Sequence, residues 1–432
     1  MRRDFLKLCG MAGLGFAYPG TKSIYAADAK EEPPYDGPFY VVFNASGGWD
    51  TTYLMDPKGI NEMNRLYKEG DILTKGQHKF APTAKTMKAS SAGASGMSNE
   101  DFYKEFGDEL LTLNGLDYSV NNHSPGARYM ATGKLDSLAY PTFAALVAAC
   151  KGPTCPLSYL TFGNYSATGN LVAMSRVPYL PSLQKIANAD SIEGNKRSPY
   201  HEDFALFRIE QALKEESDAR AALPRLPRQE RSESMLYAAQ VNSKSMQRVT
   251  PYIPANSPKE RLSQQAEIAL ASFKAGVCVS ANLSIGQFDS HANNDADQMK
   301  LIPEFLAGIA YFIRRAGELK IREKLVVVIQ SEMGRTPNYN KGNGKDHWSI
   351  GSIQFLGPGI KGNRVLGATD DKLFQVPINP MTLALDKEKG VRVRPEHIHT
   401  ALRQFAGIEA HPHCKKFPLG VAEKDVLKGL WG

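Results

Sequence analysis

Acidic and imidazole side chains recur in short segments that lie far apart in the sequence. Carboxylate oxygens and neutral imidazole nitrogens are the groups with which proteins bind zinc, manganese and similar divalent ions. In Asp289-Ser290-His291 the two potential ligands alternate, so on an extended segment they face the same side. An acid after glycines or a histidine in a loop is often a turn former, so the metal hypothesis depends on the whole set. The set comprises Asp50, His123, Asp289, His291, Glu332, Asp346 and His347.

The segment 325–349 indicates how the backbone would position these groups. It opens with a β-branched run, 325–329, which predicts a short buried strand. Glu332 follows this strand directly, and Asp346 and His347 lie in the glycine- and asparagine-rich loop beyond it. An α/β protein carries its binding loops at the carboxyl ends of its strands, so this order predicts metal ligands there.

Strands alternate with helices along the rest of the chain. Strand candidates are 39–43, 109–113, 157–162 and 351–356, and the apolar run 277–288 returns the chain to the core. Predicted helices begin near 124 and cover 141–149, 298–319 and 395–405. This alternation predicts an α/β fold with a mostly parallel sheet covered on both faces by helices. A charged helical insertion is expected around 180–265, and a loop or lid at 90–98.

The composition limits the class of protein. The chain has 432 residues, of which 42% are hydrophobic and 22% charged. After a linker at 30–38, this is enough for one large domain over 39–432. The net charge of +7 suits an anionic substrate. No lysine and arginine stripe with interleaved aromatics is present, so a nucleic-acid partner is not expected. Cys150 and Cys155 could close a small disulfide loop or remain unpaired thiols.

The first 29 residues are predicted to form an export signal. Arg2-Arg3-Asp4-Phe5-Leu6-Lys7 matches the twin-arginine motif, and a mild apolar run, 8–18, follows it. Ala27-Asp28-Ala29 is a small-x-small cleavage signal. The apolar run is too short to span a bilayer permanently. We therefore expect a periplasmic or otherwise extracytoplasmic protein whose transient partner is the twin-arginine translocase. An uncleaved amphipathic helix is the alternative.

Several motifs together resemble the alkaline phosphatase and sulfatase superfamily. SEMG at 331–334 is similar to its Ser/Thr-Asp-His-Gly segment. HSPGARYMATGK at 123–134 resembles the sulfatase nucleophile segment, Cys-x-Pro-x-Arg followed by Leu-Thr-Gly-Arg. FNASGGWD, FDSHANN, SEMGR and GKDHWS, in this order, look most like a bacterial, twin-arginine-exported family of that superfamily, the domain of unknown function 1501. The match covers nearly the whole mature chain apart from the middle insertion, and it implies a three-layer α/β/α sandwich.

The resemblance implies a metal-dependent hydrolase of phosphate or sulfate esters, with a small anionic ester as substrate. One or two divalent ions, zinc, manganese or calcium, would clamp the ester and activate the nucleophile. Asp289, His291 and His347 would hold one ion. The second or shared ion would be held by Asp50 and Glu332, helped by His123 and Asp346.

The resemblance also implies an arginine that steadies the anion through its planar fork, either Arg128 or Arg335. A solvated helix arginine is the alternative for Arg128, and an arginine paired with a neighbouring carboxylate is the alternative for Arg335.

The chain departs from the superfamily at the nucleophile. His123 stands where a serine, threonine or modifiable cysteine is expected, so it could be a further metal ligand or a phosphohistidine-type nucleophile. Ser124, Thr51 and Thr52 are alternative nucleophiles. Glu332 and Met333 replace an Asp-His pair, which removes one histidine ligand. These departures leave a second hypothesis: a catalytically degenerate member that binds an anionic or carbohydrate ligand, or a partner protein. A structural exported protein is the third.

Overall fold

The computed structural model describes residues 33–83, 96–163, 165–188, 201–223, 226, 229 and 242–432. The predicted export signal and most of the predicted 90–98 loop lie outside the described residues. The chain divides into two compact units. One comprises 33–200 and 242–432, and the other contains helix α7 (Asp203–Ala221). In the described part of the chain, no helix has the length and apolar character needed to cross a membrane.

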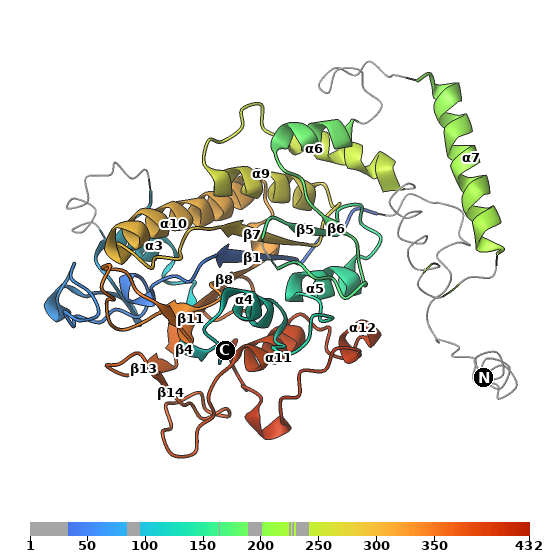
Figure 1. Cartoon of the computed structure of the whole chain (residues 1–432). Helices are drawn as coiled ribbons and strands as arrows, with labels where there is room; N and C mark the ends of the chain where they lie inside the picture. The colour runs from blue at the N-terminus through green and yellow to red at the C-terminus, as the bar shows by residue number, and fades with distance from the viewer. Residues whose placement is uncertain are drawn as a thin grey trace, which may run out of the picture. The chain divides into compact units, whose positions relative to one another are not determined.

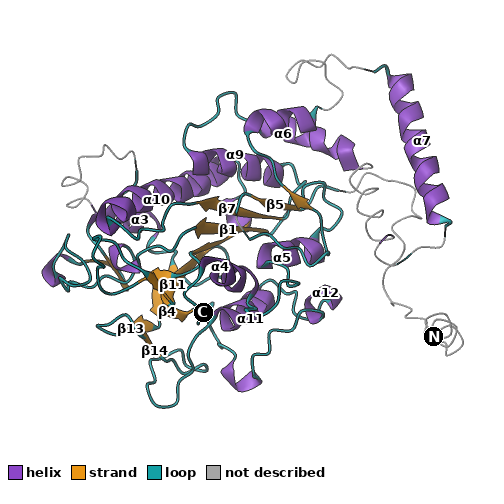
Figure 2. Ribbon diagram, in the orientation of Figure 1, coloured by secondary structure: helices purple, strands orange, loops and turns teal. Residues whose placement is uncertain are grey.

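The larger unit is built on an eight-stranded sheet (Figures 1 and 2). The strand order is β12-β4-β11-β8-β1-β7-β5-β6. The bounds are β1 (Phe39–Ala45), β4 (Leu111–Asp117), β5 (Tyr159–Thr161), β6 (Met174–Ser175), β7 (Ser280–Ile285), β8 (Leu325–Gln330), β11 (Ile350–Leu356) and β12 (Arg364–Leu366).

Strand β11 alone runs against its neighbours in this sheet, whereas all other pairs are parallel. A parallel strand needs a long crossover, usually a helix, to return to the sheet. The chain between β8 and β11 contains only the small hairpin of β9 (Gly334–Arg335) and β10 (His347–Trp348), so β11 returns antiparallel. The sheet is mostly parallel, as the sequence predicts.

Helices cover both faces of the sheet. On one face lie α3 (Asn99–Phe106), α6 (Leu180–Ala187), α9 (Arg261–Lys274) and α10 (Asn294–Glu318). On the other lie α4 (His123–Thr132), α5 (Phe143–Lys151), α11 (Pro395–Phe405) and α12 (Pro412–Lys415). Successive residues of β1 alternate between the two cores: Val41 and Phe43 pack in the first, Tyr40 and Val42 in the second. A strand buried on both sides is the signature of a three-layer sandwich, so the predicted fold class is confirmed.

Short two-stranded hairpins lie outside the eight-stranded sheet. They are β2 (Leu73–Lys75) with β3 (His78–Phe80), β9 with β10, and β13 (Ala368–Thr369) with β14 (Gln375–Val376). The stretch 180–265 holds α6, α7, a 3₁₀ segment (Asn242–Tyr252) and the start of α9. Helix α9 packs against α10 and β7 on the sheet, so the last part of this stretch belongs to the core. Cys150 and Cys155 are free thiols.

Candidate metal centre

The candidate ligands gather where parallel strands end. His123 follows β4, Asp289 and His291 follow β7, and Glu332 follows β8. These strands run in one direction, so their carboxyl ends meet at one edge of the sheet. His347 arrives by a different route, since β10 pairs with β9 in an antiparallel register that places it opposite Arg335.

Helix α4 carries His123 as its first residue, after the N-cap Asn122, whose side chain accepts a hydrogen bond from the Ser124 amide. The first turn of this helix lies against the backbone of Glu332. A Cβ atom on Gly126 would stand 2.7 Å from the Glu332 carbonyl oxygen, so a larger residue there would push the helix away. The close approach lets His123 Nδ1 reach Glu332 Oε1 at 3.0 Å.

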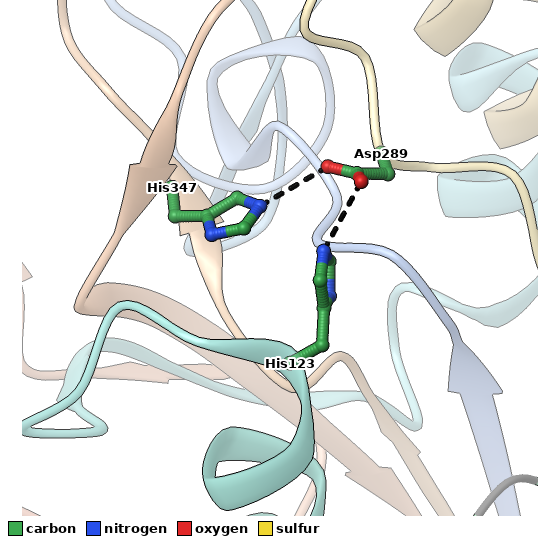
Figure 3. Close-up of side chains that lie close together, drawn as sticks. All are labelled: His123, Asp289 and His347. Atoms are coloured by element: carbon green, nitrogen blue, oxygen red, sulfur yellow. Dashed lines mark hydrogen bonds and ion pairs between the residues drawn. The ribbon is translucent and has the colours of Figure 1, made fainter.

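His123, Asp289 and His347 form the centre of the cluster (Figure 3). One nitrogen or oxygen from each lies within 4.8 Å of the other two. His123 Nε2 is 3.1 Å from Asp289 Oδ2, and His347 Nε2 is 3.2 Å from Asp289 Oδ1. The two imidazole rings meet edge to face, with centroids 4.4 Å apart. Figure 3 shows both rings directed at the carboxylate, one from the start of α4 and the other from β10.

His291 extends the cluster on the exposed side. Its Nε2 lies 3.1 Å from Asp289 Oδ1 and 3.0 Å from His347 Nε2. Its Nδ1 contacts Asp346 Oδ1 at 2.9 Å. The side chains of Asp289 and His291 therefore lie on the same side of their segment, as the Asp-x-His spacing predicts. Asp346 contacts the ring of His291 at the other nitrogen, Nδ1.

All three histidines have Nδ1 next to an acceptor that cannot donate. These acceptors are Glu332 Oε1 for His123, Asp346 Oδ1 for His291 and the Asn121 carbonyl oxygen, at 3.1 Å, for His347. A neutral ring that donates from Nδ1 to its acceptor keeps a lone pair on Nε2. Metal-binding histidines are oriented in this way by carboxylates and carbonyls. The Nε2 atoms of all three rings lie 3.1 to 3.2 Å from an oxygen of Asp289.

Asp289 carries the negative charge at the middle of this cluster. Burial alone would raise its pKa, but the hydrogen bond and charge of Arg335, followed by the charge of His123, lower the pKa to about 2. The hydrogen bond to Glu332 in turn raises the pKa of His123, against the opposing effect of burial. Asp289 is therefore ionised at neutral pH, as a metal ligand must be.

Arg335 is fully buried and holds the ligand loops together. Its guanidinium donates to the carbonyl oxygens of Gly47, Gly48 (2.8 Å) and Lys345 (3.0 Å), and to Asp289 Oδ1 at 2.8 Å. Its side chain is 0% exposed. It cannot contact a substrate anion, so the geometry favours the alternative in which Arg335 pairs with a neighbouring carboxylate.

Asp50 lies outside the cluster. Its Oδ2 accepts from Lys345 Nζ at 2.6 Å and from Asn294 at 3.0 Å, and its Oδ1 accepts from the backbone amide and hydroxyl of Thr52. Both oxygens are fully engaged, and the residue is 1% exposed. No lone pair of Asp50 is left for a metal, because its four acceptor sites are occupied. The structure therefore does not bring Asp50 and Glu332 together as a second metal pair.

The residues expected to bind the anion or to act as the nucleophile lie at different places in the structure. Arg128 Nε donates to the Leu135 carbonyl oxygen at 2.7 Å, which anchors the end of α4 rather than the cluster. Thr51 and Thr52 are buried, and the Thr52 hydroxyl donates to Asp50. Ser124 is exposed beside His123.

The donor set fits a transition-metal ion better than calcium. Three imidazole nitrogens with one carboxylate are typical of zinc and its neighbours, whereas calcium takes oxygen ligands. His123 Nε2 supports this fit, because the atom is buried and makes no hydrogen bond. It lies 3.1 Å from Asp289 Oδ2. A metal-binding nitrogen needs no hydrogen-bond partner from the protein, because its lone pair binds the metal. A buried nitrogen that has no such partner in the described structure is therefore consistent with a ligand.

Lys345 is a positioning residue that the motifs alone did not single out. Its amide donates to the Ser290 carbonyl oxygen at 3.0 Å, its own carbonyl accepts from Arg335, and its ammonium group pairs with Asp50. It thereby connects the loops that carry His291 and His347. The available signal was a lysine directly before the Asp346-His347 pair, which sequence patterns do not distinguish from a surface lysine.

A protein-family model described as "Protein of unknown function (DUF1501)" matches residues 40–384. The match spans every candidate ligand, from Asp50 to His347. No curated protein matches the sequence.

Solved structures with a similar chain path include several sulfatases. Ps i-CgsB is 8% identical with a TM-score of 0.40, covering 93% of this chain and 76% of that one. The lipoteichoic acid synthase LtaP from Listeria monocytogenes is 9% identical with a TM-score of 0.38, covering 93% and 79%. The sulfatase PsFucS1 from Pseudoalteromonas sp. is 10% identical with a TM-score of 0.35, covering 89% and 69%. At these identities no residue role is transferred from them to this chain.

Proposed function

This chain belongs to the DUF1501 family, described as proteins of unknown function, and we propose that it is an exported, metal-dependent hydrolase of phosphate or sulfate esters. The observation that carries the proposal is the convergence of three Nε2 atoms on the Asp289 carboxylate. With each ring protonated at Nδ1, a metal ion among these atoms would satisfy all of them at once.

His123, Asp289, His291 and His347 are the residues that would hold the ion, and zinc or manganese suits them. A divalent ion at this position supplies Lewis acidity, which polarises the ester and makes water more acidic. Glu332 and Asp346 hold His123 and His291 in the ligating tautomer. Asp289 is 42% exposed and His291 46%, so a substrate oxygen and a water molecule have access from the exposed side.

Water is the proposed nucleophile. The contacts of Asp289 and the three histidines in the described structure include no serine, threonine or cysteine side chain. Thr51 and Thr52 are buried away from the cluster, which leaves Ser124 as the hydroxyl to exclude by experiment.

A second function is supported by the arginines. Arg335 is buried, and Arg128 donates its Nε–H to a backbone carbonyl at the end of α4, so neither guanidinium is shown to face a substrate anion at the cluster. This placement favours a catalytically degenerate protein that uses the same metal centre to bind an anionic or carbohydrate ligand, or a partner protein, without turnover. Such a protein would be stabilised by its ligand through mass action and would form no product.

Metal analysis combined with turnover assays separates these functions. Purified protein with bound metal should hydrolyse an aryl phosphate or an aryl sulfate, and a chelator should abolish the activity. Bound metal with no turnover of either ester, but with a raised melting temperature on adding sulfated sugars, would favour the binding function. No metal above background would contradict both.

Export through the twin-arginine pathway completes the proposal. The motif at 2–7 predicts that the translocase carries the folded protein, with its metal, to the periplasm. Replacing Arg2 and Arg3 together by lysine should retain the protein in the cytoplasm, as measured by cell fractionation. Unchanged periplasmic yield would contradict the proposed route.

A further inference from the structure

A cleft lies among the helices on the face of the sheet that α3, α6, α9 and α10 cover, away from the metal centre. Helices α3, α9 and α10 border a cleft of about 1150 Å³. Tyr311, on its wall, lies seventeen residues beyond Asn294 at the start of α10. At 1.5 Å per residue this is a separation of about 25 Å along the helix from the end that lies next to the metal-binding loops. The cleft therefore cannot share a small ligand with the metal centre.

Glu267 forms the polar base of this cleft. The residue is 1% exposed. Its Oε1 accepts from the Tyr311 hydroxyl and from Arg315 Nε, the latter at 3.0 Å. Its Oε2 is buried and has no hydrogen-bond partner among the described residues. A buried carboxylate oxygen without a donor is costly, so this oxygen indicates that a donor belongs in the cleft.

The two arginines of the cleft are already engaged by acids. Arg314 pairs with Glu105, with Nε 2.8 Å from Oε1. Arg315 pairs with Glu267 and also with Glu318, at 2.7 Å. The wall nevertheless carries five carboxylates against three cationic side chains. The field in the cleft is therefore negative and attracts a cation.

The shape and donor arrangement favour an organic cation over a metal ion. Among the described residues, the His123 cluster is the group whose donors converge as metal ligands do, and no carboxylate of the cleft belongs to it. The volume exceeds that of a compact ligand pocket, which suits an elongated molecule. Apolar wall residues such as Met97, Pro254 and Ala307 offer contact for methylene groups.

We propose that the cleft between α3, α9 and α10 binds an elongated aliphatic amine, with an ammonium group donating to Glu267 Oε2. A primary ammonium group has three donors and a compact positive charge, which matches a carboxylate oxygen that lacks a donor. The proposal is independent of the metal centre and of its chemistry.

Calorimetric titration of the metal-loaded mature protein with spermidine and with putrescine tests this site. Spermidine should bind saturably, and Glu267→Gln should weaken binding by about tenfold or more, because it removes the charge but keeps the shape. Ala307→Phe fills the cleft while keeping the Glu267 carboxylate and should weaken binding similarly. The Ala307→Phe variant still tests the cleft if Glu267→Gln does not fold.

Glu304→Gln is the matched control. Glu304 lies on α10 and pairs with Arg261 outside the cleft wall, so this variant makes the same change in net charge. Binding in Glu304→Gln should equal that of the parent. No saturable binding by the parent, full binding by both cleft variants, or an equal loss in Glu304→Gln would overturn the proposal.

Discussion

The Nε2 atoms of His291 and His347 face each other at 3.0 Å, and both lie beside the carboxylate of Asp289. His291 Nδ1 lies against a carboxylate and His347 Nδ1 against a carbonyl oxygen, so each ring can donate a proton from Nδ1. In that tautomer the two Nε2 lone pairs and the Asp289 oxygen face one another. A metal ion placed among them would accept all three as ligands.

Asp289→Asn tests the carboxylate at the centre. The substitution keeps the shape but removes the charge and one strong donor, so the dissociation constant for zinc should rise by about 100-fold or more. Competition with a chromophoric chelator measures it. Asp136→Asn removes a carboxylate that is fully exposed and should leave zinc affinity unchanged. Equal affinity in the parent and Asp289→Asn would exclude Asp289 as a ligand.

Glu332→Gln tests the pH dependence of the metal-free protein. The bond to Glu332 raises the pKa of His123 above its ordinary value of 6.5. A raised histidine pKa contributes stability that is fully present below pH 6.5 and is lost as pH rises through the folded-state value. The metal-free parent should therefore lose unfolding free energy above pH 6.5, and Glu332→Gln should lose less.

Histidine NMR titration in chelator, with urea denaturation at several pH values, provides the readout. The same raised pKa means that protons compete with the metal at higher pH than for an ordinary histidine. A His123 resonance that titrates at or below 6.5 in the parent would contradict this coupling.

Arg335→Lys tests the anchor beneath the ligands. Lysine cannot reproduce a planar fork that reaches three carbonyl oxygens and Asp289, so buried acceptors lose their donors. Asp289 is 42% exposed, so most of the cost comes from the carbonyl bonds, and unfolding free energy should fall by about 2 to 4 kcal/mol.

Urea denaturation measures this loss, and Arg322→Lys provides the matched control. Arg322 pairs with Glu109 on the surface, so its replacement should change stability by less than about 0.5 kcal/mol. A loss of the same small size in Arg335→Lys would show that Arg335 does not hold the loops.

Ser124→Ala decides between water and serine as the nucleophile. If water attacks the ester, kcat of Ser124→Ala for an aryl ester should stay within about threefold of the parent. A covalent nucleophile would instead lower kcat by about a thousandfold or more. A burst of aryl product in the parent that is absent from Ser124→Ala would overturn the assignment to water.

Local patterns were sufficient for the layers of the fold but not for the direction of every strand. The β-branched run 325–329 and the apolar spacing of 298–319 predicted β8 and α10, because burial on a sheet or a helix leaves a period in the sequence. The antiparallel direction of β11 depends on how the chain from 331 to 349 returns to the sheet. The direction of β11 is set by the path of the whole loop, and no local periodicity in the sequence indicates that path.

The candidate site also combines features that the sequence predicts with features that depend on tertiary structure. Asp289, His291 and His347 were recognised because their residue types and their places beyond strands suit a metal. Asp50 has the same signature, yet a buried lysine takes its carboxylate. The deciding residue, Lys345, is 295 positions away in sequence, so the pairing depends on tertiary structure. His123 was predicted to help Asp50 and Glu332 at a second or shared ion, whereas its place beside Asp289 and His347 follows only from the approach of α4.

Elemental analysis of protein purified from its native compartment decides whether the His123 cluster holds a metal ion. We expect about one equivalent of zinc or manganese per chain, falling to background in His347→Ala while the protein remains folded. Folded native protein with no transition metal, and whose histidine resonances do not respond to added zinc or manganese, would contradict the claim that these side chains form a metal centre.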